Sequence, residues 1–270
     1  MQTGKIQQIV LHVFPWEIDE FDRFADLCKA NSKYLAENDN IILDVSLNIS
    51  DVVVNWKESK IPSEFYVDKF NSILKKFDWN NSNIVEIVED DSCLGCVDKR
   101  RNSLRQSGDD VDVFTWVDTD IVFSDYHLSF LRRTLDTIDG DYYIVSGQLP
   151  KMWDASWDIL VHPRYIREPY LKSKDGYHKF DCYEINKVVS ECLDIIEVQN
   201  ITPFKFGGGF LTTISSKLLK FMDIPDSFGS YGLEDTFVMF CSQMMNNCGM
   251  GVNQYVMKNT LLSEDNLYKN

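Results

Sequence analysis

The chain has 270 residues, enough to bury the core of one large α/β domain without disulfides or structural metals. Its 42 acidic residues outnumber its 27 basic ones, which gives a formal net charge of −15. A field of this sign repels phosphate backbones, so the composition argues against nucleic acids and anionic membrane surfaces as partners.

The N-terminus and the cysteines bear on the compartment in which the chain works. Residues 1–8 are polar, and the apolar run that follows them is too short for a signal sequence or a membrane span. Seven cysteines are scattered along the sequence, and this odd number favours free thiols in a reducing compartment. We therefore expect a cytoplasmic protein without a transmembrane segment.

Strands and helices alternate in the first half of the sequence. The strands predicted from short apolar runs cover residues 6–14, 41–49, 84–88 and 112–117. The helices predicted between them cover residues 18–34, 65–77 and 96–106, and the last of these is polar and rich in arginine. Such alternation predicts an α/β, Rossmann-like domain with a mixed, mostly parallel central sheet and helices on both faces.

The ends of the predicted strands show where a ligand would bind. In parallel sheets of this kind, ligands lie beyond the carboxyl ends of the strands. The segments that follow the four predicted strands are 14–15, 48–50, 89–91 and 118–120. We expect these four segments to lie along one rim of the sheet and to form the binding site.

The second half of the sequence is less regular. The elements predicted there are a strand at 142–146 and helices at 188–196, 215–222 and 234–245, the last with acids at its start. Residues 151–176 are rich in aromatic and basic side chains and have little periodicity, which is typical of a long functional loop. The final residues, 251–270, have the composition of a tail.

The strongest chemical signal is Asp118-Thr119-Asp120, which comes directly after a predicted buried strand. Carboxylate oxygens are hard ligands that suit Mg²⁺ or Mn²⁺, and such a metal neutralises the charge of a diphosphate. The same residue types also favour an ordinary turn after a strand, so the motif alone leaves both interpretations open.

Two longer runs resemble one known family. RRNSLRQSGDDVDVFTWVDTDIVF (100–123) resembles the part of inverting GT-A glycosyltransferases in which an Arg-Asn pair on a helix precedes a strand ending in a DxD motif. KFGGGFLTTISSKLLKFMDIPDSFGSYGLEDTFVMF (205–240) is similar to the acceptor segment of the same superfamily, where a glycine-rich strand leads to a Gly-x-Glu-Asp turn that opens a helix.

The resemblance implies a single GT-A domain over residues 1–270. Residues 1–123 would form the half that binds the nucleotide sugar, 124–250 the half that binds the acceptor, and 251–270 a C-terminal tail. The implied activity is transfer of a sugar from a nucleoside-diphosphate sugar, most often a uridine donor in this family, to a hydroxyl of a glycan or glycoconjugate acceptor, with inversion.

The resemblance also implies roles for individual residues on the donor side. Asp118 and Asp120 would hold Mn²⁺ or Mg²⁺ against the donor diphosphate. The donor-binding residues expected from the motifs and from the rim are Phe14, Asn48, Arg101, Asp118 and Thr119.

On the acceptor side, the implied general base is Asp235, and Glu234 is the alternative, better suited to hydrogen-bond the acceptor hydroxyls. A helix N-terminus favours the ionised form of both. The remaining residues expected to contact the acceptor are Gly208, Gly209, Trp153 and Trp157. Glycines let the backbone approach a sugar closely, and tryptophan faces stack on sugar rings, although Trp153 and Trp157 suit core anchors equally well.

The sequence departs from the family at one position that concerns the metal. Many members carry a C-terminal histidine ligand, but the four histidines here, at 12, 127, 162 and 178, all precede Asp235. The third protein ligand is therefore absent, replaced by water, or supplied by another residue.

Two other functions compete with sugar transfer. Without the metal-binding histidine, the chain could be a degenerate member that binds sugars or partners without turnover. Asp118-x-Asp120 also resembles the motif of haloacid-dehalogenase-like phosphatases, but three predicted strands precede it and no later paired-acid GD motif follows.

Overall fold

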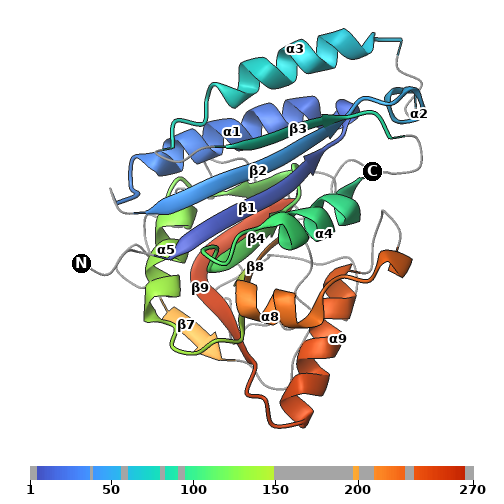
Figure 1. Cartoon of the computed structure of the whole chain (residues 1–270). Helices are drawn as coiled ribbons and strands as arrows, with labels where there is room; N and C mark the ends of the chain where they lie inside the picture. Colours follow the sequence, from blue (N-terminus) through green and yellow to red (C-terminus); the bar gives the residue numbers. More distant parts are fainter. Residues whose placement is uncertain are drawn as a thin grey trace, which may run out of the picture.

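The computed structural model describes residues 5–36, 39–55, 60–79, 83–90, 95–148, 197–200, 210–228 and 234–264. In this part of the chain, nine strands form one mixed sheet with helices packed against both of its faces (Figure 1). None of the helices in these ranges is long and apolar enough to cross a membrane.

The N-terminal half alternates strands and helices as expected. Its strands are β1 (Ile6–Val13), β2 (Asn40–Asn48), β3 (Ile84–Val88) and β4 (Val113–Val117). Its helices are η1 (Pro15–Glu17), α1 (Ile18–Ser32), α2 (Asp51–Val54), α3 (Ser63–Leu74) and α4 (Cys96–Gln106). β1 pairs in parallel with β2 and with β4, and β2 pairs in parallel with β3. The carboxyl ends of these four strands therefore share one edge, which confirms the predicted rim.

The C-terminal half extends the sheet with both parallel and antiparallel strands. Its strands are β5 (Ile121–Phe123), β6 (Tyr143–Gln148), β7 (Glu197–Asn200), β8 (Leu211–Ser215) and β9 (Asn253–Glu264). Its helices are α5 (His127–Thr137), α8 (Ser216–Met222), η3 (Asp226–Phe228) and α9 (Glu234–Asn247). The strand order is β3-β2-β1-β4-β8-β6-β9-β5, with β7 also paired to β9.

Strand directions confirm a mixed sheet that is mostly parallel. β8 runs antiparallel to both of its neighbours, β4 and β6, and β9 runs parallel to β6. β5 and β7 both run antiparallel to β9. Of the nine strands in the described ranges, β1, β2, β3, β4, β6 and β9 thus point the same way.

Alternation along the strands explains why helices cover both faces. Ile9 and Leu11 point to one side of β1 and pack in a core with α1 and α3. Val10 points to the other side and packs with Trp116 of β4 and with apolar residues of α4, α8 and α9. The central strands β1 and β4 are buried on both faces, which is why apolar residues occupy neighbouring positions along much of each strand.

Residues 251–270, expected to be a tail, contain the longest strand of the described chain. β9 pairs with β6 over Tyr143–Ser146, and Met257 of β9 is buried in a core with Leu131 and Tyr143. The expectation of a tail is therefore corrected over Asn253–Glu264. The strand was missed because its sequence is polar and its stability comes from pairing with β6, which lies far away in the sequence.

Two other expected elements lie outside the described residues: the loop at 151–176 and the helix at 188–196.

Candidate active site

The Asp118-Thr119-Asp120 turn begins where the buried strand β4 ends. The amide of Asp118 donates a 2.9 Å hydrogen bond to the carbonyl of Phe210, at the start of β8, and the amide of Ile121 donates one of 3.3 Å to the carbonyl of Asp118. These two bonds fix the backbone of the turn between β4 and β5. The motif thus lies at the rim of the sheet, as its sequence position predicted.

Arg100 of α4 joins the turn to the start of α9. Its guanidinium donates through Nη2 to Oδ1 of Asp118 at 2.8 Å, and through Nη1 to Oε1 of Glu234. The side chains of Arg100 and Glu234 are each only 4% exposed, whereas that of Asp118 is 42% exposed. The guanidinium carbon also lies 5.2 Å from the centre of the Trp116 ring, within the range of a cation–π contact.

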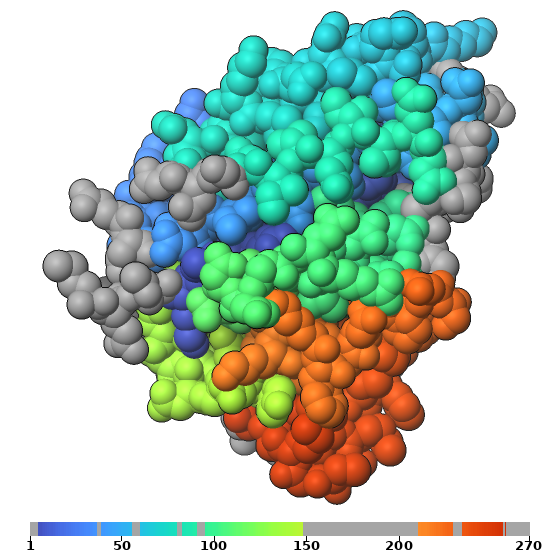
Figure 2. All heavy atoms as spheres, in the orientation of Figure 1, coloured from blue at the N-terminus to red at the C-terminus, as the bar shows by residue number. Residues whose placement is uncertain are grey.

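The position of α4 explains how one arginine reaches both halves of the chain. The helix contacts β1 and β2 on one side and α8 on the other. Figure 2 shows its residues in green between the blue and cyan N-terminal elements and the orange α8. Arg100 therefore brings together two expected site residues, Asp118 and Glu234, that lie far apart in the sequence.

Burial and neighbouring charges act in opposite directions on Asp118. Desolvation raises the pKa of its carboxyl, and the Arg100 guanidinium lowers it, while the Asp120 and Glu234 carboxylates raise it further. The net effect is a pKa above the ordinary value for aspartate. Desolvation is the largest of these effects, ahead of the opposing effect of Arg100.

Thr119 faces the turn after β1. Its Oγ1 donates a 2.6 Å hydrogen bond to Oε2 of Glu17, in η1, and its side chain is buried. Burial raises the pKa of Glu17 to about 7, the hydrogen bond from Thr119 lowers it, and the charges of Asp120 and Asp118 raise it. From α1, Arg23 donates a 3.2 Å hydrogen bond to the carbonyl of Asp120. Thr119, expected to contact the donor, instead anchors the turn to η1.

The two acids at the start of α9 differ in their surroundings. Glu234 is buried against Arg100, and its Oε2 has no hydrogen-bond partner among the described residues. Asp235 is half-buried, and its Oδ1 accepts from the amide of Thr236 in the first turn of the helix. Of the two acids, Asp235 is thus the more accessible to a ligand.

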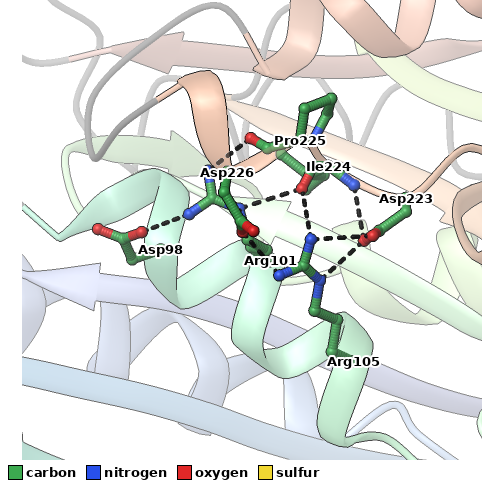
Figure 3. A network of polar contacts seen from close by, with 7 residues as sticks. All are labelled: Asp98, Arg101, Arg105, Asp223, Ile224, Pro225 and Asp226. Carbon is green, nitrogen blue, oxygen red and sulfur yellow. Dashed lines mark hydrogen bonds and ion pairs between the residues drawn. The ribbon is translucent and has the colours of Figure 1, made fainter.

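Arg101 holds the loop after α8 in place, as Figure 3 shows. Its guanidinium donates to the carbonyls of Ile224 at 3.1 Å and Pro225 at 2.9 Å, and it pairs with Asp98 one turn earlier. These contacts give Arg101 a structural role, and its expected contact with the donor stays a prediction. The basic residue of α4 beside Asp118 is Arg100.

Phe14 and Asn48 lie at the expected rim, and both support its structure. Phe14 is buried and stacks on Trp16 with ring centres 4.8 Å apart. The amide of Asn48 bridges the ends of β2 and β3, because its Nδ2 donates to the carbonyl of Asp90 and its Oδ1 accepts from the amide of Ser50. Asn48 is fully buried, so in this structure its side chain holds the rim together.

The residues expected to contact the acceptor, apart from the acids of α9, lie outside the described residues: Trp153, Trp157, Gly208 and Gly209. Phe210, which follows the glycines directly, accepts the amide of Asp118 through its carbonyl. The glycine-rich segment therefore leads directly to a residue bonded to the DxD turn.

The side chains around the turn bear on the expected metal. Within the ranges that the structure describes, no group of three or more His, Cys, Asp or Glu side chains is arranged to hold an ion. The turn itself carries two carboxylates, the oxygen ligands that Mn²⁺ and Mg²⁺ prefer, and these cations keep several positions for water and phosphate oxygens. The side chain of Asp118 is 42% exposed, so an ion can reach its carboxylate.

Sequence reasoning missed two residues of this site, Arg100 and Glu17. Arg100 is the neighbour of the expected Arg101 in the sequence. It lies four residues after Cys96 and so on the same side of α4 as Cys96, which is a different side from that of Arg101. Glu17 follows Pro15 at the end of β1, so the same strand-end argument that selected Phe14 would have found it.

Comparison with known proteins gives a likeness in structure alone. No protein-family model matches the chain, and no curated protein sequence matches it. A solved structure described as a crystal structure of a mycobacterial protein aligns at 14% identity with a TM-score of 0.47, over 97% of this chain and 68% of that one. The crystal structure of residues 1–349 of S. aureus TarS aligns at 11% identity with a TM-score of 0.51, over 95% of this chain. The match spans 60% of the TarS chain, and at this identity it shows a shared α/β fold.

Proposed function

We propose that the chain is a glycosyltransferase of the GT-A type that moves a sugar from a nucleoside-diphosphate donor to a hydroxyl of a glycan or glycoconjugate. The observation that carries the proposal is the convergence of Asp118, Arg100 and Glu234 at the carboxyl edge of a mostly parallel sheet. It joins the DxD turn to the acidic helix start, the two motifs on which the family resemblance rests. The shared fold with TarS, a glycosyltransferase, supports the same class.

On the donor side, Asp118 and Asp120 would hold Mn²⁺ or Mg²⁺. When bound, the metal would neutralise charge on the diphosphate leaving group. Glu17 and Arg23 hold the turn that carries both aspartates, through Thr119 and the carbonyl of Asp120. We propose a uridine donor, because uridine donors dominate the family that the motifs resemble.

On the acceptor side, Asp235 is the better general base. A base must reach the acceptor hydroxyl and be ionised at neutral pH. Glu234 is buried and held by Arg100, so its carboxylate positions other groups, whereas Asp235 is half-buried at the same helix start. With one carboxylate taking the proton as the new bond forms, the anomeric centre would be inverted.

Nucleotide binding tests the proposal directly. Thermal unfolding would be followed with UDP, GDP, CDP and dTDP, each with Mn²⁺ or with EDTA. A nucleotide present at about 100 times its Kd stabilises a folded protein by about 2.7 kcal/mol, which is readily detected. We expect one diphosphate to raise the Tm with Mn²⁺, and Asp120→Asn to remove the effect.

The same experiment separates the competing functions. No response to any of the four diphosphates would contradict the proposal. A response without sugar transfer to any acceptor or to water would favour a degenerate binding protein. Release of phosphate from small phosphoesters, without a sugar nucleotide, would favour a haloacid-dehalogenase-like phosphatase.

A further inference from the structure

The positive charge of Arg100 bears on metal binding as well as holding the two motifs together. It is a buried cation placed against Asp118, a carboxylate proposed to bind another cation. Any divalent ion bound at Asp118 therefore experiences both the attraction of the carboxylates and the repulsion of this guanidinium. The balance between the two determines how tightly the site holds a metal.

Glu234 controls how much of the Arg100 charge reaches Asp118. Both carboxylates hydrogen-bond to the same guanidinium, Asp118 through Nη2 and Glu234 through Nη1. Arg100 and Glu234 are almost completely buried, so solvent screens their charges weakly. The charge of Glu234 thus offsets much of the repulsion that Arg100 would otherwise exert on a cation at Asp118.

We propose that Arg100 is an internal counter-ion that sets the metal affinity of the Asp118-Thr119-Asp120 turn, and that Glu234 tunes it without touching the metal. This inference rests on the proposed metal site. It gives Arg100 and Glu234 the role of positioning residues, which act on the metal through Asp118. It also links the start of α9, on the proposed acceptor side, to the donor side by charge.

We therefore expect two substitutions to change the affinity for the metal ion in opposite directions. Glu234→Gln removes a negative charge and leaves Arg100 paired with Asp118, so metal binding weakens. Replacing Arg100 as well removes the repulsion, so metal binding becomes tighter again. At an effective dielectric constant of about 20, two charges a few ångströms apart interact strongly enough to change the Kd for the metal ion by about tenfold.

The experiment measures binding of Mn²⁺ alone, from the loss of the free-ion signal in electron paramagnetic resonance. The proteins compared are wild type, Glu234→Gln, Arg100→Gln/Glu234→Gln and Arg100→Lys/Glu234→Gln. The paired variants avoid leaving Glu234 buried without its partner, a change that could prevent folding. Asp120→Asn shows whether the measured ion binds at the turn.

We expect Glu234→Gln to bind Mn²⁺ about tenfold more weakly than wild type, and Arg100→Gln/Glu234→Gln to bind at least about tenfold more tightly than Glu234→Gln. Arg100→Lys/Glu234→Gln keeps the positive charge and should resemble Glu234→Gln. Arg105→Gln, on the same helix but bonded to Asp223 and Asp226, is the matched control and should bind like wild type.

The outcomes separate this inference from the proposed function. If wild type leaves the free Mn²⁺ signal unchanged, the metal site and the inference both fail. If wild type binds Mn²⁺ at the turn and all Arg100 and Glu234 variants bind equally well, the metal site stands and the inference alone is overturned.

Discussion

Thr119 donates a 2.6 Å hydrogen bond to Glu17 and so ties the middle residue of the DxD turn to the first turn of chain after β1. The two residues come from opposite ends of the N-terminal half, yet they meet because β1 and β4 are parallel neighbours. Thr119 is buried, so its hydroxyl is unavailable to a donor in this structure. Its role is to hold Asp118 and Asp120 in place.

Thr119→Val tests this role, because valine keeps the shape and removes the hydroxyl. Glu17 then loses a hydrogen-bond donor at a site that is largely desolvated, and we expect a loss of about 1–3 kcal/mol in the free energy of unfolding. Urea denaturation at pH 8 measures the change. Thr119→Ser keeps the hydroxyl and serves as the control; equal stability of the valine variant and wild type would contradict the role.

Glu17 gives a prediction about pH. Its pKa of about 7 in the folded protein exceeds the value of about 4.5 expected when unfolded, mainly because of burial. Between these two values the folded state binds the additional proton, so this group makes folding less favourable as pH rises from about 4.5 to about 7. Above pH 7 the full penalty is present.

Glu17→Gln removes that penalty and keeps an oxygen that accepts from Thr119. We expect the variant to have a higher Tm than wild type at pH 8, by roughly 2–4 °C for each kcal/mol regained, and the difference to shrink towards pH 5. Calorimetry in EDTA across this range makes the measurement. A difference in Tm that is constant with pH would show that Glu17 titrates normally.

Arg101 and Arg105 form a matched pair for the loop after α8 (Figure 3). Arg101 is buried and bonds the carbonyls of Ile224 and Pro225, whereas the side chain of Arg105 is 39% exposed against Asp223. We expect Arg101→Met to cost about 3 kcal/mol of stability and Arg105→Met about 1 kcal/mol or less. Urea denaturation measures both, and equal effects would contradict a structural role specific to Arg101.

Much of the N-terminal half could be predicted from the sequence. β3 has the predicted bounds, and β1, β2 and β4 lie within one residue of theirs, because apolar residues are concentrated in all four strands, although the side chains of β3 are largely exposed. α4 also has the predicted bounds. The antiparallel insertion of β8 and the strand β9 were not predicted, since each depends on partners that no local pattern specifies.

The candidate site was predicted at the level of segments and less well at the level of side chains. Adjacent residues on a helix point about 100° apart, so the choice between Arg100 and Arg101 depends on how α4 is rotated against β1 and β2. The spacing of the basic residues can be read from the sequence, but this rotation cannot. Burial of three successive basic residues, Lys99 to Arg101, was also unexpected, and each is paired with an acid in the fold.

The final prediction distinguishes the two acids at the start of α9. Asp235→Asn removes the proposed base with little change in shape, and general base catalysis contributes about 10²–10⁴-fold, so we expect kcat to fall by that factor with KM nearly unchanged. Glu234→Gln keeps Asp235, so its main effects should be lower stability and a higher requirement for Mn²⁺, because Arg100 loses a buried partner. Steady-state kinetics at saturating Mn²⁺ and NMR of the product's anomeric configuration make the comparison. Full activity of Asp235→Asn would exclude Asp235 as the base, and a product with retained configuration would exclude the single displacement that requires one.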